Sequence, residues 1–334
     1  MRLIQSANKF IDRLRTDAVY RSTLRNERER LTAKTKKGVQ SLFSLIVIVG
    51  ISYIILGPLI GIIANSFFSD ADKYNPMVYL IPMEPTLERY QLATMRLDYF
   101  KVLLNSLLFS LGLMALQVMV CSMVGYGFAR FDFPLKKLLF GCVIVMIVIP
   151  AHSIMLPIYM AFQSFDPLGI MGMAGAGAAN LLKSPLPITI MTALGCGLRS
   201  GLYIYIFIQF FRGLPKEIEE AAYVDGCGMW YTYFRIMLIN ATPAVVTVAI
   251  FSLVWQYNDV FYANLFLLDV NMAISKKITT LQATITNLDK ILDPSLSLLY
   301  VNAGVVLTLL PVVIVYILLQ KQFIEGVERS GIVG

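Results

Sequence analysis

The amino-acid sequence predicts an all-α, polytopic membrane protein with about six transmembrane helices. Of its 334 residues, 57% are hydrophobic and only 15% are charged. The mean hydropathy is +0.69, which is far too apolar for an ordinary soluble domain of this size. Apolar runs long enough to cross a hydrocarbon core of about 30 Å recur along the chain. These observations together favour a chain that crosses a membrane several times.

Six apolar runs are placed along the sequence, with boundaries good to a few residues. They cover 42–67, 101–128, 137–161, 188–211, 240–264 and 298–320. Several contain proline, which membrane helices tolerate when neighbouring helices satisfy the freed carbonyl groups. About forty polar residues precede the first run, so we expect no cleavable signal peptide. The chain therefore divides into a basic segment, 1–40, and a transmembrane domain, 41–334.

Residues 1–40 carry eleven lysine and arginine residues. The apolar residues Phe10, Ile11, Leu14 and Val19 are spaced as in an interfacial helix. The alternative, which we favour, is a solvated tail that fixes the orientation of the chain. In either case this segment is expected to lie in the cytoplasm.

The distribution of lysine and arginine predicts the sidedness of the membrane domain. With six spans, nineteen of these residues fall in segments on the side of the two termini, and eight fall on the other side. Because basic residues accumulate in cytoplasmic loops, both termini and the polar interval 212–239 are predicted to be cytoplasmic. The net charge of +7 thus reflects topology and contact with membrane lipid, and it does not indicate nucleic-acid binding.

The polar interval 212–239 predicts two short helices joined by a turn. Pro215 suits the first position of a helix, and three glutamates follow in the first two turns, where a helix N-terminus favours negative charge. Asp225 and Gly226 form a turn signal. A second helical run, from about Met229 to Leu238, leads back into apolar sequence.

This interval resembles the EAA loop of ABC importer permeases. The resemblance lies in Glu220-Ala221-Ala222, then Gly226 after three residues, and Ile236-x-Leu238 after nine more. One departure is Ile239, where the family usually has proline. The resemblance implies a coupling helix that docks into an ATPase subunit. Glu220 would contact or orient that partner, Ala221 and Ala222 would permit close approach, and Asp225 with Gly226 would set the bend.

Weaker similarities extend over roughly residues 100–334. They comprise Asn105-Ser106, Tyr126 to Arg130, Pro150 with Pro157-Ile158-Tyr159, Trp255 with Asn258-Asp259, and Phe323 to Gly334. Together they resemble the permeases of binding-protein-dependent carbohydrate ABC transporters. The resemblance implies a sugar or oligosaccharide as solute. The implied partners are a second, non-identical permease, ATP-hydrolysing subunits and an extracytoplasmic solute-binding protein, all at the cell membrane.

The polar residues Trp255, Gln256, Asn258 and Asp259 form the strongest candidate for a translocation path. Polar side chains within spans are costly and usually face a bundle interior or a wet cavity. An indole with amide and carboxylate groups suits a sugar, whose C–H face stacks while its hydroxyls form hydrogen bonds. An equally good alternative is an aromatic and polar belt at the membrane interface.

Other polar positions within the spans carry weaker signals. Asn105, Gln117 and Asn302 are explained as well by hydrogen bonds between helices. Arg199 would extend to the interface, line a cavity, or mark a wrongly placed boundary. His152 has no metal partners at ligand spacing, so a packing role is favoured over a role in the path. The glycine- and alanine-rich segment within 162–187 leaves a loop, a re-entrant element and a short extra helix open.

Nothing in the sequence indicates an enzyme. There is no phosphate-binding G-x-x-x-x-G-K-[ST] motif, so any ATP hydrolysis belongs to another chain. Metal sites, cofactors and disulfides are not expected from the spacing of the four cysteines, which suit small hydrophobic positions. Three alternatives remain open: an ABC permease for a non-sugar solute, a secondary transporter, which would need an intramembrane ion-coupling site, and a membrane scaffold.

Overall fold

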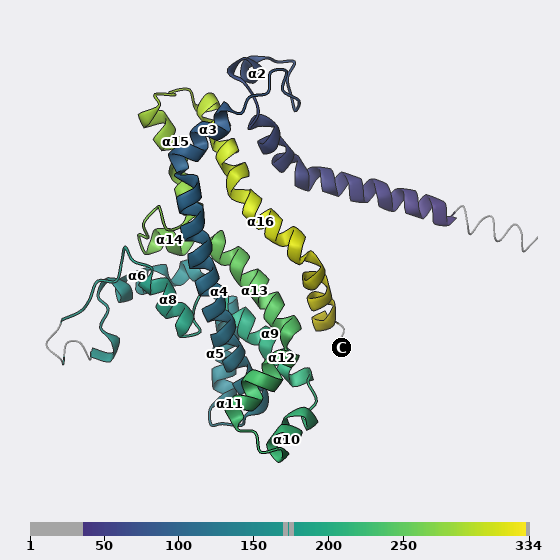
Figure 1. Ribbon diagram of the computed structural model, residues 1–334, viewed down its shortest axis with the longest axis vertical. Coiled ribbons are helices and arrows are strands. Elements are labelled where there is room, and N and C mark those ends of the chain that lie inside the picture. The colour runs from purple at the N-terminus through teal and green to yellow at the C-terminus, as the bar shows by residue number, and fades with distance from the viewer. Residues whose placement is uncertain (1–35, 170–172, 174–176, 332–334) are drawn as a thin grey trace, which may run out of the picture. The chain divides into compact units, whose positions relative to one another are not determined.

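The computed structural model describes residues 36–169, 173 and 177–331 (Figure 1). The chain forms two compact units, residues 1–61 and 62–334. In the first unit, the described residues belong to a helix that runs from Lys36 to Asn65, and no side chain in its most apolar stretch is buried. The expected basic segment 1–40 and its alternative, an interfacial helix, lie almost entirely outside the described residues.

The second unit is built from helices, with a single isolated bridge, between Phe165 and Ala179, among its described residues. In chain order the elements are α2 (Asp70–Tyr74), α3 (Glu88–Leu97), α4 (Tyr99–Arg130), α5 (Lys136–Val148), η1 (Ala151–Ile154), α6 (Met155–Gln163), η2 (Pro167–Gly169), α8 (Leu186–Ala193), α9 (Ser200–Gly213), α10 (Glu217–Val224), α11 (Met229–Tyr231), the π-helical turn η3 (Thr232–Met237), α12 (Leu238–Asn240), α13 (Thr242–Tyr257), α14 (Phe261–Leu265), α15 (Ile274–Leu288) and α16 (Pro294–Gly331).

Helix α4 is the element on which this unit is assembled. It packs along α9 and α13, while α5 covers α9, and α16 packs on α3, α13 and α15. The approach of α4 to α9 is close at Gly125, where an added Cβ would lie 2.5 Å from the Cβ of Phe207. Buried aromatic side chains of α9, among them Tyr203, Phe207 and Phe211, fill the core at this contact. Glycine at 125 therefore sets the spacing of the two central helices.

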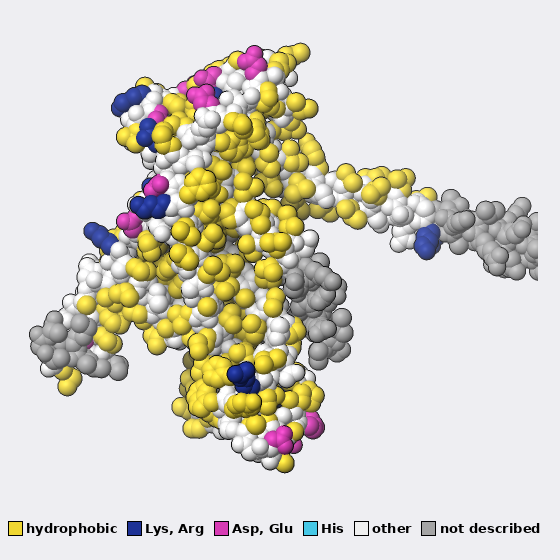
Figure 2. Space-filling model, in the orientation of Figure 1, with side chains coloured by type: hydrophobic (Ala, Val, Ile, Leu, Met, Phe, Trp, Pro, Cys, Tyr) yellow, Lys and Arg dark blue, Asp and Glu magenta, His cyan; other side chains and the backbone are white. Residues whose placement is uncertain are grey.

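Charged side chains gather at the two ends of α4 (Figures 1 and 2). One group covers α2, α3 and α15, another covers α10, and further charged side chains lie at the left edge near α14, while hydrophobic side chains cover most of the remaining visible face. Many large apolar side chains on α4 and α16 are exposed, for example Leu104, Leu108, Ile314 and Leu318. Such an apolar band between polar ends is the surface expected of a chain in a lipid bilayer.

Three of the expected spans are single long helices among the described residues. These are Lys36–Asn65, α4 and the apolar part of α16, Pro294–Gln320. Two further segments qualify only as bent pairs: α5 with the run 151–163, which meet at 105°, and the run 229–240 with α13, which meet at 78°. Within the part of the chain that the structure describes, three helices meet the length and composition of a span, or up to five if each bent pair counts as one.

The fourth expected span, 188–211, is wrong as a continuous helix. Helix α8 ends at Ala193 and α9 begins at Ser200, so a loop interrupts the run. Gly195 and Arg199 both adopt left-handed backbone conformations there, with φ of +72° and +57°. This break was not predicted, because the run 188–211 is largely apolar. Periodicity alone does not reveal a local change of backbone direction. The backbone shows that the expected helix does not run continuously through Arg199, and the contacts of its side chain are described below.

The remaining boundaries differ more modestly. Helix α13 ends at Tyr257 rather than near 264, so Asn258 and Asp259 lie beyond it. In the segment 162–187, the Phe165–Ala179 bridge closes a loop between α6 and α8. The glycine- and alanine-rich part of this segment, for which a loop, a re-entrant element and a short extra helix were the alternatives, lies mostly outside the described residues.

Candidate functional site: the coupling loop and the polar centre

The predicted helix–turn–helix is present at one end of α4, which we call the α10 end. Helix α10 begins at Glu217, two residues after Pro215, and places three glutamates in its first turn. It ends in a Schellman motif, in which the Cys227 N–H donates to the Ala222 carbonyl and the Gly226 N–H donates to the Tyr223 carbonyl, each at 3.0 Å. Gly226 has φ of +81°, which explains why glycine occupies this position.

A buried glutamate fastens α10 to the end of α4. Glu219 forms an ion pair with Arg130, with 3.2 Å between Oε2 and Nε, and the two side chains are only 9% and 5% exposed. The Tyr126 hydroxyl also donates a hydrogen bond to Glu219 Oε1. Arg130 Nη2 donates to the Leu214 carbonyl at 2.9 Å. Helix α10 is therefore linked to α4 by charge as well as by chain connection.

Aromatic rings pack around Tyr126, which donates to Glu219 of this ion pair. The Tyr126 ring packs against Phe131, Phe211 and Tyr233 at centroid distances between 5.1 and 5.4 Å. The two charged side chains are buried, so the pair interacts more strongly than an exposed pair would. Removing one partner would leave an uncompensated buried charge.

The opposite face of α10 is open. Glu220, Ala221 and Asp225 are exposed, whereas Ala222 is buried. Thus the two alanines of the motif point to different sides: Ala222 packs inward and Ala221 faces outward. Val224, at the tip, is 87% exposed.

Apolar side chains continue this exposed surface onto the next turns. Tyr223, Met229, Trp230, Tyr231 and Phe234 are all exposed large side chains, and Trp230 stacks on Phe234 at 6.2 Å. We call these five residues with Val224 the coupling surface. Contiguous exposed apolar side chains beside charged residues are typical of a protein interaction site.

Two of the four residues predicted for a translocation path share one cleft. Trp255 is exposed and has Arg199 over its ring, with 3.8 Å from the guanidinium carbon to the ring centroid. Gln256 is buried against α4. Asn258 is exposed, and its side chain donates to the Val254 carbonyl. Asp259 lines a cleft that Gln256 also lines. The structure therefore brings Gln256 and Asp259 to one cleft, whereas Trp255 and Asn258 are not among the residues that line it.

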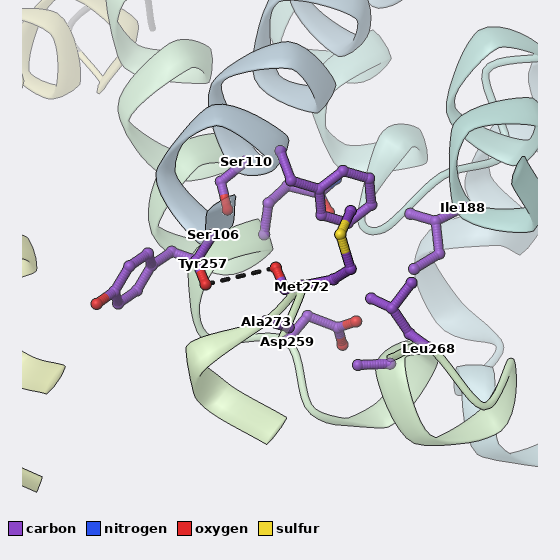
Figure 3. Close-up of a pocket in the computed structure, with 11 residues that line it drawn as sticks. Ser106, Ser110, Ile188, Tyr257, Asp259, Leu268, Met272 and Ala273 are labelled. Carbon is purple, nitrogen blue, oxygen red and sulfur yellow. Dashed lines mark hydrogen bonds between the residues drawn. The ribbon is translucent and has the colours of Figure 1, made fainter. Parts of the chain in front are cut away.

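The cleft at Asp259 lies between α4, α8 and the segment 256–273 (Figure 3). Its volume is about 10 Å³, which is room for about one water molecule. The Ser106 hydroxyl lies 3.4 Å from the Met272 carbonyl oxygen and accepts the Ile274 N–H at 2.7 Å. Ser110 and Ile188 also face this space.

A buried polar centre surrounds Gln117 of α4. Its amide nitrogen donates to the Leu198 carbonyl at 2.7 Å and to the Ser200 hydroxyl at 3.0 Å. Its amide oxygen accepts from Ser252 at 2.6 Å and from Gln256 at 3.2 Å. One side chain thus joins α4 to the start of α9 and to α13, as expected for polar contacts between membrane helices.

The other weak candidates have structural contacts. Asn105 Nδ2 donates to the Asn271 carbonyl at 3.0 Å, and the His152 ring packs against Phe261 at 4.2 Å. The four cysteines are free. No group of three or more potential metal ligands occurs within residues 36–169, 173 and 177–331.

A second set of charged contacts lies at the opposite end of α4, the α3 end. Arg96 of α3 forms an ion pair with Asp289, with its Nε 3.0 Å from Oδ2. Buried Arg89 pairs with Asp70 and lies over the Tyr300 ring at 4.4 Å. These contacts hold α3 against the α15–α16 region.

Asp72 organises the loop at this end. Its carboxylate accepts the backbone N–H groups of Ser69, Met83 and Glu84 at distances of 3.1 to 3.4 Å. Burial raises the pKa of Asp72, but the hydrogen bonds from Glu84, Met83 and Ser69 outweigh it and hold that pKa below its usual value. The ionised carboxylate thus fixes the loop between α2 and α3.

Residues 100–327 match the family described as binding-protein-dependent transport system inner membrane component. Similar proteins include the diacetylchitobiose uptake system permease protein NgcG of Streptomyces coelicolor, 25% identical over 84% of this chain and 84% of its own. The arabinooligosaccharides transport system permease protein AraQ of Halalkalibacterium halodurans is 26% identical over 85% of this chain and 93% of its own. A chain of a bacterial ABC transporter involved in the import of the acidic polysaccharide alginate superposes with a TM-score of 0.67, at 19% identity, over 85% of this chain and 96% of its own.

Proposed function

Because the chain belongs to the family of binding-protein-dependent transport system inner membrane components, we propose that it is the permease subunit of an ABC importer for a sugar or oligosaccharide. It is a transport component and not an enzyme. The proposal that the solute is a sugar is supported by relatives whose names include diacetylchitobiose, arabinooligosaccharides and trehalose. The observation that carries the proposal is a helix anchored on one face and open on the other, α10.

The partners follow from this assignment. ATP-hydrolysing subunits bind at the coupling surface, and an extracytoplasmic binding protein delivers the solute at the α3 end. A second, non-identical permease completes the passage. Both termini and α10 face the cytoplasm, in agreement with the excess of basic residues on that side of the sequence.

The coupling residues act through the two faces of α10. Val224 and its exposed apolar neighbours enter a groove of the ATPase, as an amphipathic helix does. Glu220 and Asp225, both exposed, lie at the edge of this contact and orient the partner. Gly226 fixes the direction in which the chain leaves α10.

Movement of the ATPase then reaches the membrane helices through Glu219. Its ion pair with Arg130 makes α10 and the end of α4 move together. Transport requires that ATP binding favours one conformation of the permease over the other, since equal affinity for both would shift nothing. The buried ion pair is the rigid link by which that preference passes into α4, and through α4 into α9 and α13.

The experiment is purification of the tagged chain from its own membranes, followed by reconstitution into liposomes. We expect an ATPase subunit to copurify and ATP to drive oligosaccharide uptake in the presence of the binding protein. Solute movement by the purified chain without any ATP-hydrolysing subunit would contradict the proposal and favour a secondary transporter.

A further inference from the structure

The break between α8 and α9 presents a charged side chain in an apolar region. Arg199 is the N-cap residue of α9, is exposed, and has φ of +57°. A left-handed conformation at a residue other than glycine is strained and persists only where the surroundings hold it. Irregular backbone at membrane depth is found where it is buried in protein or lines a water-filled cavity.

In the topology proposed above, Arg199 lies within the membrane core. Helix α9 has 14 residues, so its length is roughly 20 Å at 1.5 Å per residue. Its other end adjoins the polar segment with α10, outside the core. Because the core is about 30 Å thick, Arg199 falls within it. A guanidinium at that depth is costly unless it faces water, a partner charge or a ligand.

The guanidinium has no carboxylate partner in the parts of the chain that the structure describes. Its described contact is the face of Trp255, at 3.8 Å from the ring centroid. Trp255 is itself 41% exposed. The pair therefore presents a cation and an aromatic ring on one open surface.

Gln117 forms hydrogen bonds to the residues next to Arg199 and Trp255. Its bonds to Leu198 and Ser200 fix the residues on either side of Arg199, and its bond to Gln256 fixes the residue after Trp255. Gln117 is completely buried. Binding sites are pre-organised in this way, by buried hydrogen bonds that restrain the residues presenting the contact groups.

From this arrangement we propose that Arg199 and Trp255 form a solute contact in the translocation path, and that the solute is a saccharide bearing a carboxylate. The fork of an arginine matches a carboxylate in geometry and charge, and an indole offers an apolar face to a sugar ring. This inference rests on the proposed function and adds the chemical class of its substrate.

The test uses fluorescence quenching in the reconstituted complex. Subtracting the signal of a Trp255→Phe complex isolates Trp255 from every other tryptophan. Quenching is measured with iodide, with neutral acrylamide and with brominated lipid, both without nucleotide and with a non-hydrolysable ATP analogue. We expect iodide to reach Trp255 in at least one state, with a quenching constant at least about threefold higher than in Arg199→Gln, because the cation attracts the anion.

Arg199→Lys is the matched control. It keeps the charge and should keep most of the iodide preference, whereas a merely structural role of Arg199 would affect both variants alike. Trigalacturonate should protect Trp255 from iodide in the parent complex, and the neutral trisaccharide galactotriose should protect it far less.

Three results would overturn the inference. Quenching by brominated lipid alone would place the pair against lipid, and no quenching in either state would show that another segment or subunit covers it. Equal protection by the two trisaccharides, or none by either, would refute the acidic substrate class. Copurification of the ATPase, scored separately, tests the proposed function itself, so failure of the two claims can be told apart.

Discussion

The two ends of α4 use the same chemistry with different degrees of burial. At the α10 end, the Arg130–Glu219 pair is enclosed within the protein, and aromatic rings pack around Tyr126, which donates to Glu219. At the α3 end, Arg96 and Asp289 remain partly exposed, at 28% and 14%. An enclosed pair resists salt and tolerates no loss of one partner, whereas a partly exposed pair is screened. The difference suits one end to transmitting movement and the other to holding a surface loop in place.

The largest effect is expected from breaking the enclosed pair. Glu219→Gln leaves the Arg130 charge buried without its partner, at a cost of about 3–5 kcal/mol. We expect ATP-driven uptake to be lost and the thermal stability of the complex to fall.

A double variant distinguishes a loss of transmitted movement from a loss of folding. In Glu219→Leu with Arg130→Met no buried charge remains, so the stability should recover toward the parent value. If the link carries movement, uptake should stay low in the double variant although the complex assembles. Parent-level uptake in either variant would show that the ion pair transmits nothing.

The next effect is expected at the turn. Gly226→Val places a β-branched residue at φ of +81°, which costs on the order of 1–3 kcal/mol. We expect uptake to be abolished while membrane insertion persists, because nothing lies near an added Cβ at this position. Gly226→Asn should retain activity, since asparagine tolerates the left-handed conformation better. Uptake is measured in both variants. Equal uptake in Gly226→Val and Gly226→Asn would contradict the role of the turn.

A change on the open face tests the docking contact. Glu220→Lys reverses an exposed charge at the edge of the coupling surface, so the fold should persist while binding of the ATPase and uptake are lost. Glu217→Lys is the matched control, because it makes the same charge change at another exposed position of the first turn. Near-parent uptake in Glu220→Lys, or equal losses in both variants, would count against a specific contact at Glu220.

The smallest effect is expected at the α3 end, and it depends on pH. The pKa of Asp72 is lowered in the folded protein, so its stabilising contribution is complete above the ordinary value of about 4 and is lost as pH falls through the lowered one. Hydrogen exchange of residues 75–87 should therefore accelerate in acid, after correction for intrinsic rates. Asp72→Asn should exchange rapidly already at neutral pH, with a weaker acid dependence. An unchanged acid response in Asp72→Asn would assign the effect to another group.

Local sequence signals predicted the coupling loop well. Asp225-Gly226 indicated a turn, and the structure has a Schellman motif there. The glutamates indicated a helix start, which the structure places at Glu217. Both features depend on backbone preferences of a few adjacent residues, so they can be inferred without knowledge of the rest of the fold.

Contacts between distant residues were not predicted. The motif singled out Glu220, and Glu219 was assigned only to the start of the helix. The contact of Glu219 with Tyr126, 93 residues away in the sequence, distinguishes the buried carboxylate from the exposed one. Arg130 was noted for its resemblance to the family, but nothing in the sequence joined it to Glu219. The polar residues after Val254 seemed to form one cluster because they are adjacent, yet Trp255 and Gln256 are consecutive on α13 and therefore face different directions. Only Gln256 and Asp259 line the same cleft.

Photo-crosslinking at the tip of α10 tests the central claim most directly. A photoreactive phenylalanine analogue replaces Val224, which is 87% exposed, or Met77 in the loop at the α3 end, which is 83% exposed. In the assembled complex, Val224 is predicted to crosslink to the ATP-hydrolysing subunit and Met77 is not. A crosslink from Met77 to that subunit, with none from Val224, would reverse the assignment of the two ends and contradict the account.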